Sequence, residues 1–501
     1  MNRSRNAAFN SASQLLLQLV TAICGFVVPK LLLESFGSVV NGTVTSIAQF
    51  IGFISLLETG FSSVAKTALY KPLAENDRDS ISGVFNASDA FFKKIALIFV
   101  FYCFVLAFVF PYIGKNNYDF FYNFSLVLII GISTFGQYYF GISYNILFNA
   151  AQKAYIGTSL QIITIVLNAI VIAVMIKLGA GIHAIKLVSS LVFIVKPIVI
   201  NRYGKWLFKI NSKVEKNYDA LSQRWDNLGQ CVALYVHTKT AYVIMTIFLT
   251  MIEVSVYSVY SLVTTSLSAI ITGISSGFVP GLGNIYVRKE KENFKKIFSV
   301  YEFVNTFVTV GFFTIATVLI IPFVKVYTQN ITEGNYIRPL FAFLLILGEM
   351  VYCMRLPYNY MITNAGHFKQ IKKGAYLEAG MNIVISLCLV FKLGIVGLAI
   401  GNLSAMVYRT CSLVGYCSKN ITRLSQTNFY LRTFLNILAG VLGGVICLMI
   451  KPDVNNFMNW FTYAIVVSVI IFTMLIIVNV IFYKNDIKVL FLKCVNIVKK
   501  N

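Results

Sequence analysis

Hydrophobic residues occupy fourteen long stretches of the chain, which are separated by short polar connections. Most stretches reach about 20 residues, the length at which an α-helix crosses a hydrocarbon core of ~30 Å. Backbone groups in lipid must bond within their own segment, so the stretches predict helices. The predicted spans are 10–33, 41–66, 91–113, 119–149, 156–176, 180–200, 228–251, 254–282, 300–325, 337–363, 370–391, 394–416, 430–450 and 459–483. The pattern therefore predicts an all-α polytopic membrane protein with about 14 transmembrane helices.

The composition agrees with this interpretation. Hydrophobic residues make up 57% of the chain, charged residues only 12%, and the mean hydropathy is +0.75. A soluble domain of 501 residues needs more charge to cover its surface. The first stretch is too long for a signal peptide and contains Asn10, Gln14 and Gln18, so we expect it to be a membrane helix.

Basic residues are distributed unevenly among the connections. When the connections are numbered alternately from the N-terminus, one set carries 32 of the 42 Lys and Arg residues and the other carries seven. Basic residues stay on the cytoplasmic side during membrane insertion, so both termini are predicted to be cytoplasmic. Topology and lipid headgroups then explain the net charge of +23, and we expect no nucleic-acid partner.

Cysteine and histidine patterns point to neither a metal site nor a disulfide framework. The nine cysteines include no CxxC pair, and the three histidines are scattered. No GxxxxGK[ST] loop occurs, which argues against ATP hydrolysis through such a loop. We expect a protein that is not an enzyme and binds no cofactor, and coupling to an H⁺ or Na⁺ gradient stays open.

Two pairs of motifs indicate an internal duplication. KLGAGIHAI at 177–185 resembles KLGIVGLAI at 392–400, and YNILFNA at 144–150 resembles YNYMITNA at 358–365. Further matches keep nearly the same offset across two blocks of six spans, as expected for a repeated structural unit. Glycine in the first pair predicts a tight turn between the fifth and sixth helices of each copy.

The duplication predicts how the chain is divided. We expect an N-terminal lobe at 1–205, a cytoplasmic linker at 206–227, a C-terminal lobe at 228–418, and two extra spans with a basic tail at 419–501. Six spans per copy give both copies the same orientation, so a pseudo-two-fold axis along the membrane normal is expected. Two such six-helix lobes should enclose a central cleft that opens to either side by rocking.

Polar residues within the first span are candidates for lining this cleft. Asn10, Gln14, Gln18 and Thr21 follow one another at helical spacing and share one helix face. They either hydrogen-bond to neighbouring helices, at about 0.6 kcal/mol each, or face the cleft. Both alternatives stay open.

Three basic residues, Lys30, Lys239 and Arg355, fall outside both sets of connections. A bare charge deep in a bilayer costs at least about 2.5–3.5 kcal/mol, so each should face a partner or a water-filled cavity. Lys30 lies near a span end and can also snorkel to the interface. For the other two we expect a functional cation, the alternative being a buried ion pair with Glu349 or Glu58. These glutamates are also candidates for proton coupling.

Cations, carboxamides and tyrosines together suit an anionic ligand that carries sugars. Guanidinium and ammonium groups hold phosphate oxygens, whereas amides bind sugar hydroxyls and aromatic faces pack on sugar rings. The candidate substrate-binding residues are Asn10, Gln14, Gln18, Lys30, Tyr144, Asn145, Lys239, Arg355 and Asn359.

The stretch VVPKLLLESFGSVVNGTVTSIAQF at 27–50, followed by LLETGFSSVAKTALYKPLAEND at 56–77, resembles a known family. It is similar to the polysaccharide-export branch of the multidrug/oligosaccharidyl-lipid/polysaccharide (MOP) superfamily, the Wzx-type flippases of O-antigen and capsule repeat units. The resemblance implies a MATE-like fold and an undecaprenyl-diphosphate-linked oligosaccharide as substrate. It also implies export across the bacterial cytoplasmic membrane by alternating access, with a polysaccharide polymerase and a chain-length regulator as partners.

Three other functions stay open. A lipid II flippase shares the fourteen-span layout, and no motif excludes it. A cation-coupled multidrug antiporter shares the fold but usually has a more acidic cavity. A membrane glycosyltransferase or polymerase generally carries a sizeable outer loop with acidic catalytic residues, whereas the longest outer connection here, 326–336, has one acid, Glu333.

Overall fold

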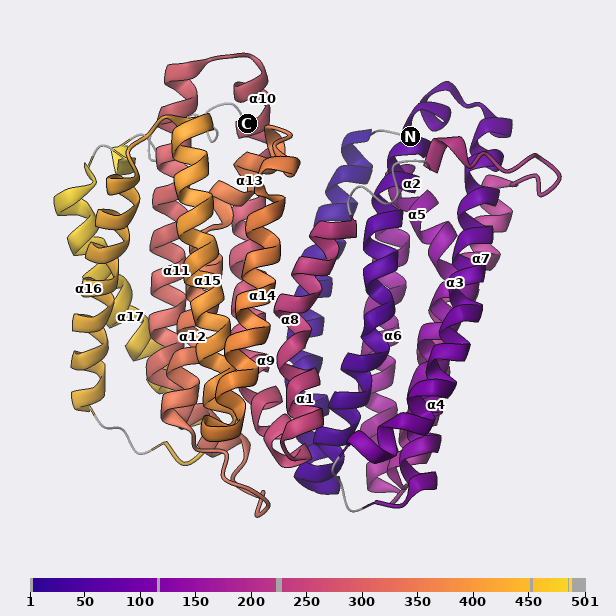
Figure 1. Ribbon diagram of the computed structural model, residues 1–501, viewed down its shortest axis with the longest axis horizontal. Helices are drawn as coiled ribbons and strands as arrows, with labels where there is room; N and C mark the ends of the chain where they lie inside the picture. Colours follow the sequence, from indigo (N-terminus) through magenta and orange to yellow (C-terminus); the bar gives the residue numbers. More distant parts are fainter. Residues whose placement is uncertain (1–2, 115–117, 222–227, 451–453, 485, 489–501) are drawn as a thin grey trace. The chain divides into compact units, whose positions relative to one another are not determined.

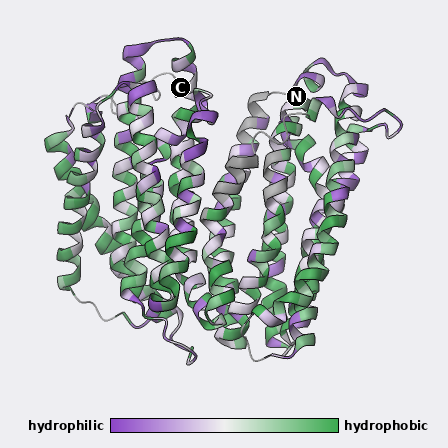
Figure 2. Cartoon of the chain, viewed as in Figure 1, coloured by the Kyte–Doolittle hydropathy of each residue, from purple (hydrophilic) through white to green (hydrophobic). Residues whose placement is uncertain are grey.

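The computed structural model describes residues 3–114, 118–221, 228–450, 454–484 and 486–488. All regular structure in these residues is helical, and eleven helical segments are long and apolar enough to cross a membrane. Figure 2 shows hydrophobic residues along the helices and hydrophilic residues mainly at their ends and turns. Every predicted span falls on one to three of the helical elements of the described residues, which confirms the all-α polytopic fold.

Contacts divide the chain into two units, one of residues 1–256 with 330–334 and the other of residues 257–329 with 335–501. The first unit (Figure 1) contains α1 (Arg3–Ile51), η1 (Gly52–Ile54), α2 (Ser55–Glu75), α3 (Arg78–Ile113), α4 (Phe120–Gly136), η2 (Gln137–Gly141), α5 (Ile142–Ala150), α6 (Ala154–Lys177), α7 (Ile182–Phe208), α8 (Leu228–Phe248) and the start of α9 (Met251–Ser276).

The second unit contains the rest of α9 and all later helices. These are α10 (Val279–Val287), α11 (Lys291–Tyr327), α12 (Pro339–Met354), α13 (Leu356–Asn364), α14 (Phe368–Leu393), α15 (Ile395–Cys417), η4 (Ser418–Thr422), α16 (Gln426–Ile450) and α17 (Phe457–Phe482). The lobe boundaries at 205 and 228 follow the duplication rather than contacts, and they stay a prediction.

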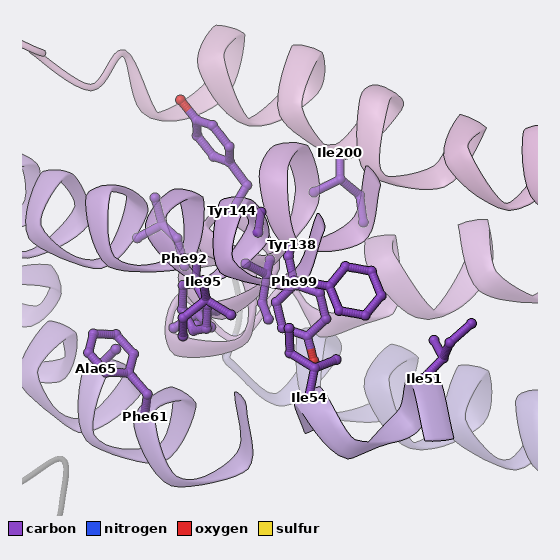
Figure 3. Close-up of a cluster of buried hydrophobic side chains, with 14 of the residues drawn as sticks. Ile51, Ile54, Phe61, Ala65, Phe92, Ile95, Phe99, Tyr138, Tyr144 and Ile200 are labelled. Atoms are coloured by element: carbon purple, nitrogen blue, oxygen red, sulfur yellow. The ribbon is translucent and has the colours of Figure 1, made fainter. Parts of the chain in front are cut away.

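Aromatic and branched side chains of α1, η1, α2, α3, α4, η2, α5 and α7 form a core of the first unit, part of which is drawn in Figure 3. Phe61 stacks on Phe91 and meets Phe92 edge-on, with ring centroids 3.8 and 5.0 Å apart. Each aromatic pair contributes about 0.5–1.5 kcal/mol beyond its buried area. The hydrophobic effect contributes little to helix association in lipid, because the lipid tails are as apolar as the side chains. Close side-chain packing therefore fixes the positions of these helices around Tyr138.

Residues with a left-handed backbone mark the same places in both copies of the duplication. Eight of the ten described residues with positive φ form four pairs separated by 213 to 215 positions: Asn76 with Lys289, Gln152 with Gly366, Gly179 with Gly394, and Lys209 with Arg423. Each follows the end of a helical segment, where a left-handed residue closes the last turn. Because turn geometry is independent of hydrophobic composition, these pairs support the duplication. They also confirm the predicted glycine turns, at Gly179 and Gly394.

Gly37 joins the two helical segments of α1. Its φ of 78° and ψ of 178° favour glycine, and a Cβ atom would lie 2.7 Å from a Glu333 carboxylate oxygen. That carboxylate accepts a hydrogen bond from the backbone N–H of Ser38 at 2.6 Å.

Gly37→Ala should therefore destabilise the protein by about 1–3 kcal/mol, because the alanine is strained and displaces Glu333. The apparent melting temperature of the detergent-purified protein measures this loss. Gly25→Ala is the control, because Gly25 has open space around its Cβ position. Equal melting temperatures in the two variants would contradict the role given to Gly37.

Candidate functional site

The first unit contains a polar pocket of about 310 Å³ within its spanning helices. The ammonium of Lys196, on α7, donates a hydrogen bond to the Gln161 carboxamide oxygen on α6 at 2.6 Å. The pocket is lined by Ser133, Thr134, Gln137, Gly141, Ile142, Asn145, Gln161, Phe193, Lys196, Pro197 and Ile200. It thus combines one cation with three carboxamide side chains.

The local backbone shapes this pocket. The π-helical turn η2 interrupts the α-helix between α4 and α5, a feature often found at functional sites. Gly141 ends that turn and packs against Pro197 of α7, where a Cβ atom would approach the proline to 2.5 Å. Gly157 on α6 similarly leaves room for the carboxamide oxygen of Asn145. The two glycines therefore allow η2 to pack closely on α7 and α5 to pack closely on α6.

Glu58 lies near this pocket and has a direct partner. The Tyr138 hydroxyl donates to Glu58 Oε2 at 2.7 Å, and Glu58 also interacts electrostatically with Lys196. The carboxylate is thus held by a neutral donor with a cation nearby. Its role in coupling stays a prediction.

Lys239 on α8 has a similar environment in the same unit. Its ammonium donates to Gln49 Oε1 at 2.6 Å, and the Tyr235 hydroxyl donates to the Gln49 backbone oxygen at 3.1 Å. Neither Glu349 nor Glu58 is the bonded acceptor. Lys196 and Lys239 therefore each donate to a neutral amide oxygen rather than to a carboxylate.

Arg355, between α12 and α13, belongs to a buried ion cluster in the second unit. Its Nη2 atom lies 2.9 Å from Glu378 Oε1, and Arg409 Nε lies 3.2 Å from Glu378 Oε2. The side chains are 9%, 5% and 8% exposed for Arg355, Arg409 and Glu378. The alternative drawn from the sequence, an ion pair with Glu349 or Glu58, names other acids: the acid paired with Arg355 in the structure is Glu378. Glu349 instead accepts from the Ser268 hydroxyl at 2.9 Å.

The candidates on α1 do not come together in one site. Asn10 donates to the Gln152 backbone oxygen at 3.1 Å and accepts from the Tyr155 N–H at 2.7 Å, so it binds α1 to the start of α6. Gln14 and Gln18 are exposed. Lys30 forms an ion pair with Glu34 at 3.6 Å.

The remaining candidates, Tyr144, Asn145 and Asn359, lie in the paired motifs YNILFNA (144–150) and YNYMITNA (358–365). Asn145 lines the polar pocket, whereas Tyr144 is buried against Phe85 with ring centroids 4.5 Å apart. Asn359 is half-buried on α13. Of the sequence candidates in the first unit, the structure thus places Asn145 in the pocket and Glu58 beside it.

Sequence reasoning missed Lys196, Gln161, Glu378 and Arg409. The topology count assigns Lys196 and Arg409 to cytoplasmic connections, although both lie inside predicted spans. Glu378 likewise lies within the predicted span 370–391. The position of Lys196, Arg409 and Glu378 inside predicted spans was the feature of the sequence that could have identified them.

The sequence matches no protein-family model and no curated protein. Its structure, however, is similar to the inward closed conformation of lipid II flippase MurJ, with a TM-score of 0.70 and 15% identity over 95% of this chain and 99% of that one. The chain has the fold of this flippase structure.

Two drug transporters support the same assignment of fold. An inward-facing multidrug resistance MATE family transporter of the MOP superfamily has a TM-score of 0.58 and 16% identity over 80% of this chain and 95% of its own. The MATE multidrug transporter DinF-BH has a TM-score of 0.59 and 15% identity over 83% of this chain and 97% of its own. These neighbours are transporters and a flippase rather than enzymes.

Proposed function

We propose that this protein is a flippase that moves undecaprenyl-diphosphate-linked oligosaccharide repeat units from the inner to the outer leaflet of the bacterial cytoplasmic membrane. One observation carries the proposal: two lysines within predicted membrane spans, Lys196 and Lys239, donate their hydrogen bonds to neutral carboxamide oxygens. The fold adds support, because the flippase match extends over 95% of this chain and the two drug-transporter matches over 80% and 83%.

The lysines suit a diphosphate for an electrostatic reason. Hydrogen bonds between an ammonium and a phosphate are charge-assisted and about twice as strong as neutral ones. A phosphate oxygen can replace the Gln161 or Gln49 oxygen without first breaking an ion pair with a bonded carboxylate. The carboxamides of Gln137 and Asn145 line the same pocket as Lys196 and can bind sugar hydroxyls.

Alternating access supplies the movement in this proposal. The unit would be released to the outer leaflet, where a polysaccharide polymerase and a chain-length regulator would be its partners. Lipid II is the second candidate substrate, and the match to a lipid II flippase favours it. A cationic drug is disfavoured, because it would be repelled by Lys196 and Lys239.

Deleting the gene tests this function in the native host. We expect loss of a surface glycan and accumulation of its lipid-linked repeat unit in the inner leaflet, detected by lectin labelling of cells and by mass spectrometry of extracted lipids. The wild-type gene should restore export. Accumulation of lipid II with cell lysis would favour the second candidate, and an intact glycan with no accumulating lipid would contradict both.

A further inference from the structure

The second unit contains a larger pocket at the end that the charge distribution predicts to be cytoplasmic. Its volume is about 600 Å³, and it is formed where α10, α13 and η4 end and α11 begins. Four cations line it: Lys289, Lys291, Lys295 and Arg423. This group of cations lies outside the polar pocket of the first unit.

The cations are only partly balanced by acids. Lys295 pairs with the exposed Glu292 at 3.2 Å, and such surface pairs are weak. The lining carboxylate of Glu290 accepts from the Asn293 side chain at 2.7 Å. The pocket therefore keeps an excess of positive charge.

One part of the same pocket is apolar. Ile285, Val287, Phe294 and Ile421 line it, and Val287 is 76% exposed. Cations beside apolar side chains at a membrane surface match a lipid with a phosphate headgroup, because the phosphate pairs with the cations and the chain packs on the apolar part.

The corresponding place in the first unit is covered by the chain's own linker. The backbone N–H of Asn211 donates to the Ser82 hydroxyl at 3.2 Å, and the N–H of Asn217 donates to the Gly83 carbonyl at 3.1 Å. Ser82 and Lys295 are 213 positions apart, the offset that relates Asn76 to Lys289. In the second unit the chain passes from Arg423 into α16 at Gln426, and the pocket is present there.

Helix capping differs in the same way. Asp77 caps α3 by accepting from the N–H groups of Asp79 and Ser80, at 3.1 and 3.0 Å. The Ser80 hydroxyl and these N–H groups lower the pKa of Asp77. Glu290, at the start of α11, makes no such side-chain cap. In the first unit the linker covers the start of α3 and a side chain caps that helix. In the second unit the start of α11 lacks this side-chain cap, and cations line the pocket there.

We propose that the pocket of Lys289, Lys291, Lys295 and Arg423 binds the phosphate group of a membrane lipid at the cytoplasmic surface. A lipid phosphate occurs both in anionic phospholipids and in polyprenyl diphosphates. The site does not depend on which substrate the protein transports.

Backbone geometry offers variants that separate binding from folding. Lys289 and Arg423 have φ angles of 59° and 54°, a region that glycine adopts more readily. The double variant Lys289→Gly with Arg423→Gly therefore removes two cations without straining the backbone. The control is Lys213→Gln with Lys216→Gln, which removes two exposed cations from the linker.

The experiment measures lipid bound to the purified full-length protein by native mass spectrometry. The probes are dioleoyl phosphatidylglycerol, dioleoyl phosphatidylcholine, undecaprenyl diphosphate and inorganic phosphate. We expect wild type and control to retain at least one of the two anionic lipids over phosphatidylcholine. The glycine variant should retain at least tenfold less, with an unchanged or raised melting temperature.

The two anionic lipids distinguish the source of the phosphate. Retention of phosphatidylglycerol alone identifies a phospholipid site, and stronger retention of undecaprenyl diphosphate identifies a site that receives the transported lipid. Both results support the proposal. Equal retention in the glycine variant and wild type would overturn it, as would binding of inorganic phosphate only.

Discussion

Replacing Lys196 with alanine should reduce translocation of the lipid-linked substrate at least tenfold. The variant loses the ammonium that donates to Gln161 in the polar pocket. A hydrogen bond to a charged group contributes about 1.5–3 kcal/mol, and each 1.4 kcal/mol corresponds to about tenfold. Export of surface glycan in a complemented deletion strain measures the effect.

The control for this prediction is Lys177→Ala, an exposed lysine at the end of the same α6 that carries Gln161. It should export normally, and both variants should reach wild-type abundance in the membrane. Lys239→Ala is expected to behave like Lys196→Ala, because its ammonium has the same kind of acceptor. Normal export in both Lys196→Ala and Lys239→Ala would contradict the role of these cations.

Replacing Glu378 with alanine should cause the largest loss of stability, about 3–5 kcal/mol. Its carboxylate forms ion pairs with both Arg355 and Arg409, and all three side chains are buried. Removing it leaves two guanidinium groups in a medium where an unpaired charge is costly. The midpoint of heat-induced aggregation, followed by size-exclusion chromatography of the detergent-purified protein, measures this.

Glu75→Ala is the matched control for Glu378. Glu75 pairs with Lys71 at 4.0 Å, but the two side chains are 57% and 83% exposed, so the pair contributes at most about 1 kcal/mol. Its removal should leave the aggregation midpoint nearly unchanged. A Glu378→Ala protein as stable as Glu75→Ala would mean that Arg355 and Arg409 do not depend on this carboxylate.

The ion cluster changes how Arg355 is understood. The sequence predicts a functional cation at this depth, and the structure places it in contact with a carboxylate. Two guanidinium groups share this carboxylate, so the charge of the three residues remains positive. The role of Arg355 as a substrate ligand stays a prediction. A substrate phosphate would have to compete with a carboxylate at Arg355, but only with a carboxamide for the hydrogen bonds of Lys196 and Lys239.

The spans and the duplication could be predicted because both depend on properties local in the sequence. The bilayer imposes a length of about 20 apolar residues on each span, so hydrophobic stretches locate the helices. The turns at Gly179 and Gly394 could be predicted because a left-handed residue favours glycine wherever the fold places it.

The site was harder to predict because it depends on contacts between distant helices. Gln161 and Lys196 are 35 positions apart and meet only because α6 and α7 pack together. Glu378 and Arg409 meet through the packing of α14 and α15. The positive-inside pattern also concealed Lys196 and Arg409, because a basic residue near the cytoplasmic end of a span gives the same signal whether it meets water or a pocket.

Translocation by the purified protein in liposomes tests the central claim most directly. A fluorescent polyprenyl-diphosphate-linked oligosaccharide is placed in both leaflets, and a membrane-impermeant quencher reports how much reaches the outer one. A cationic dye is assayed in parallel. We predict that the wild-type protein moves the lipid-linked oligosaccharide and leaves the dye in place, and that Lys196→Ala with Lys239→Ala moves neither. Transport of the dye without movement of the lipid-linked oligosaccharide would contradict the account.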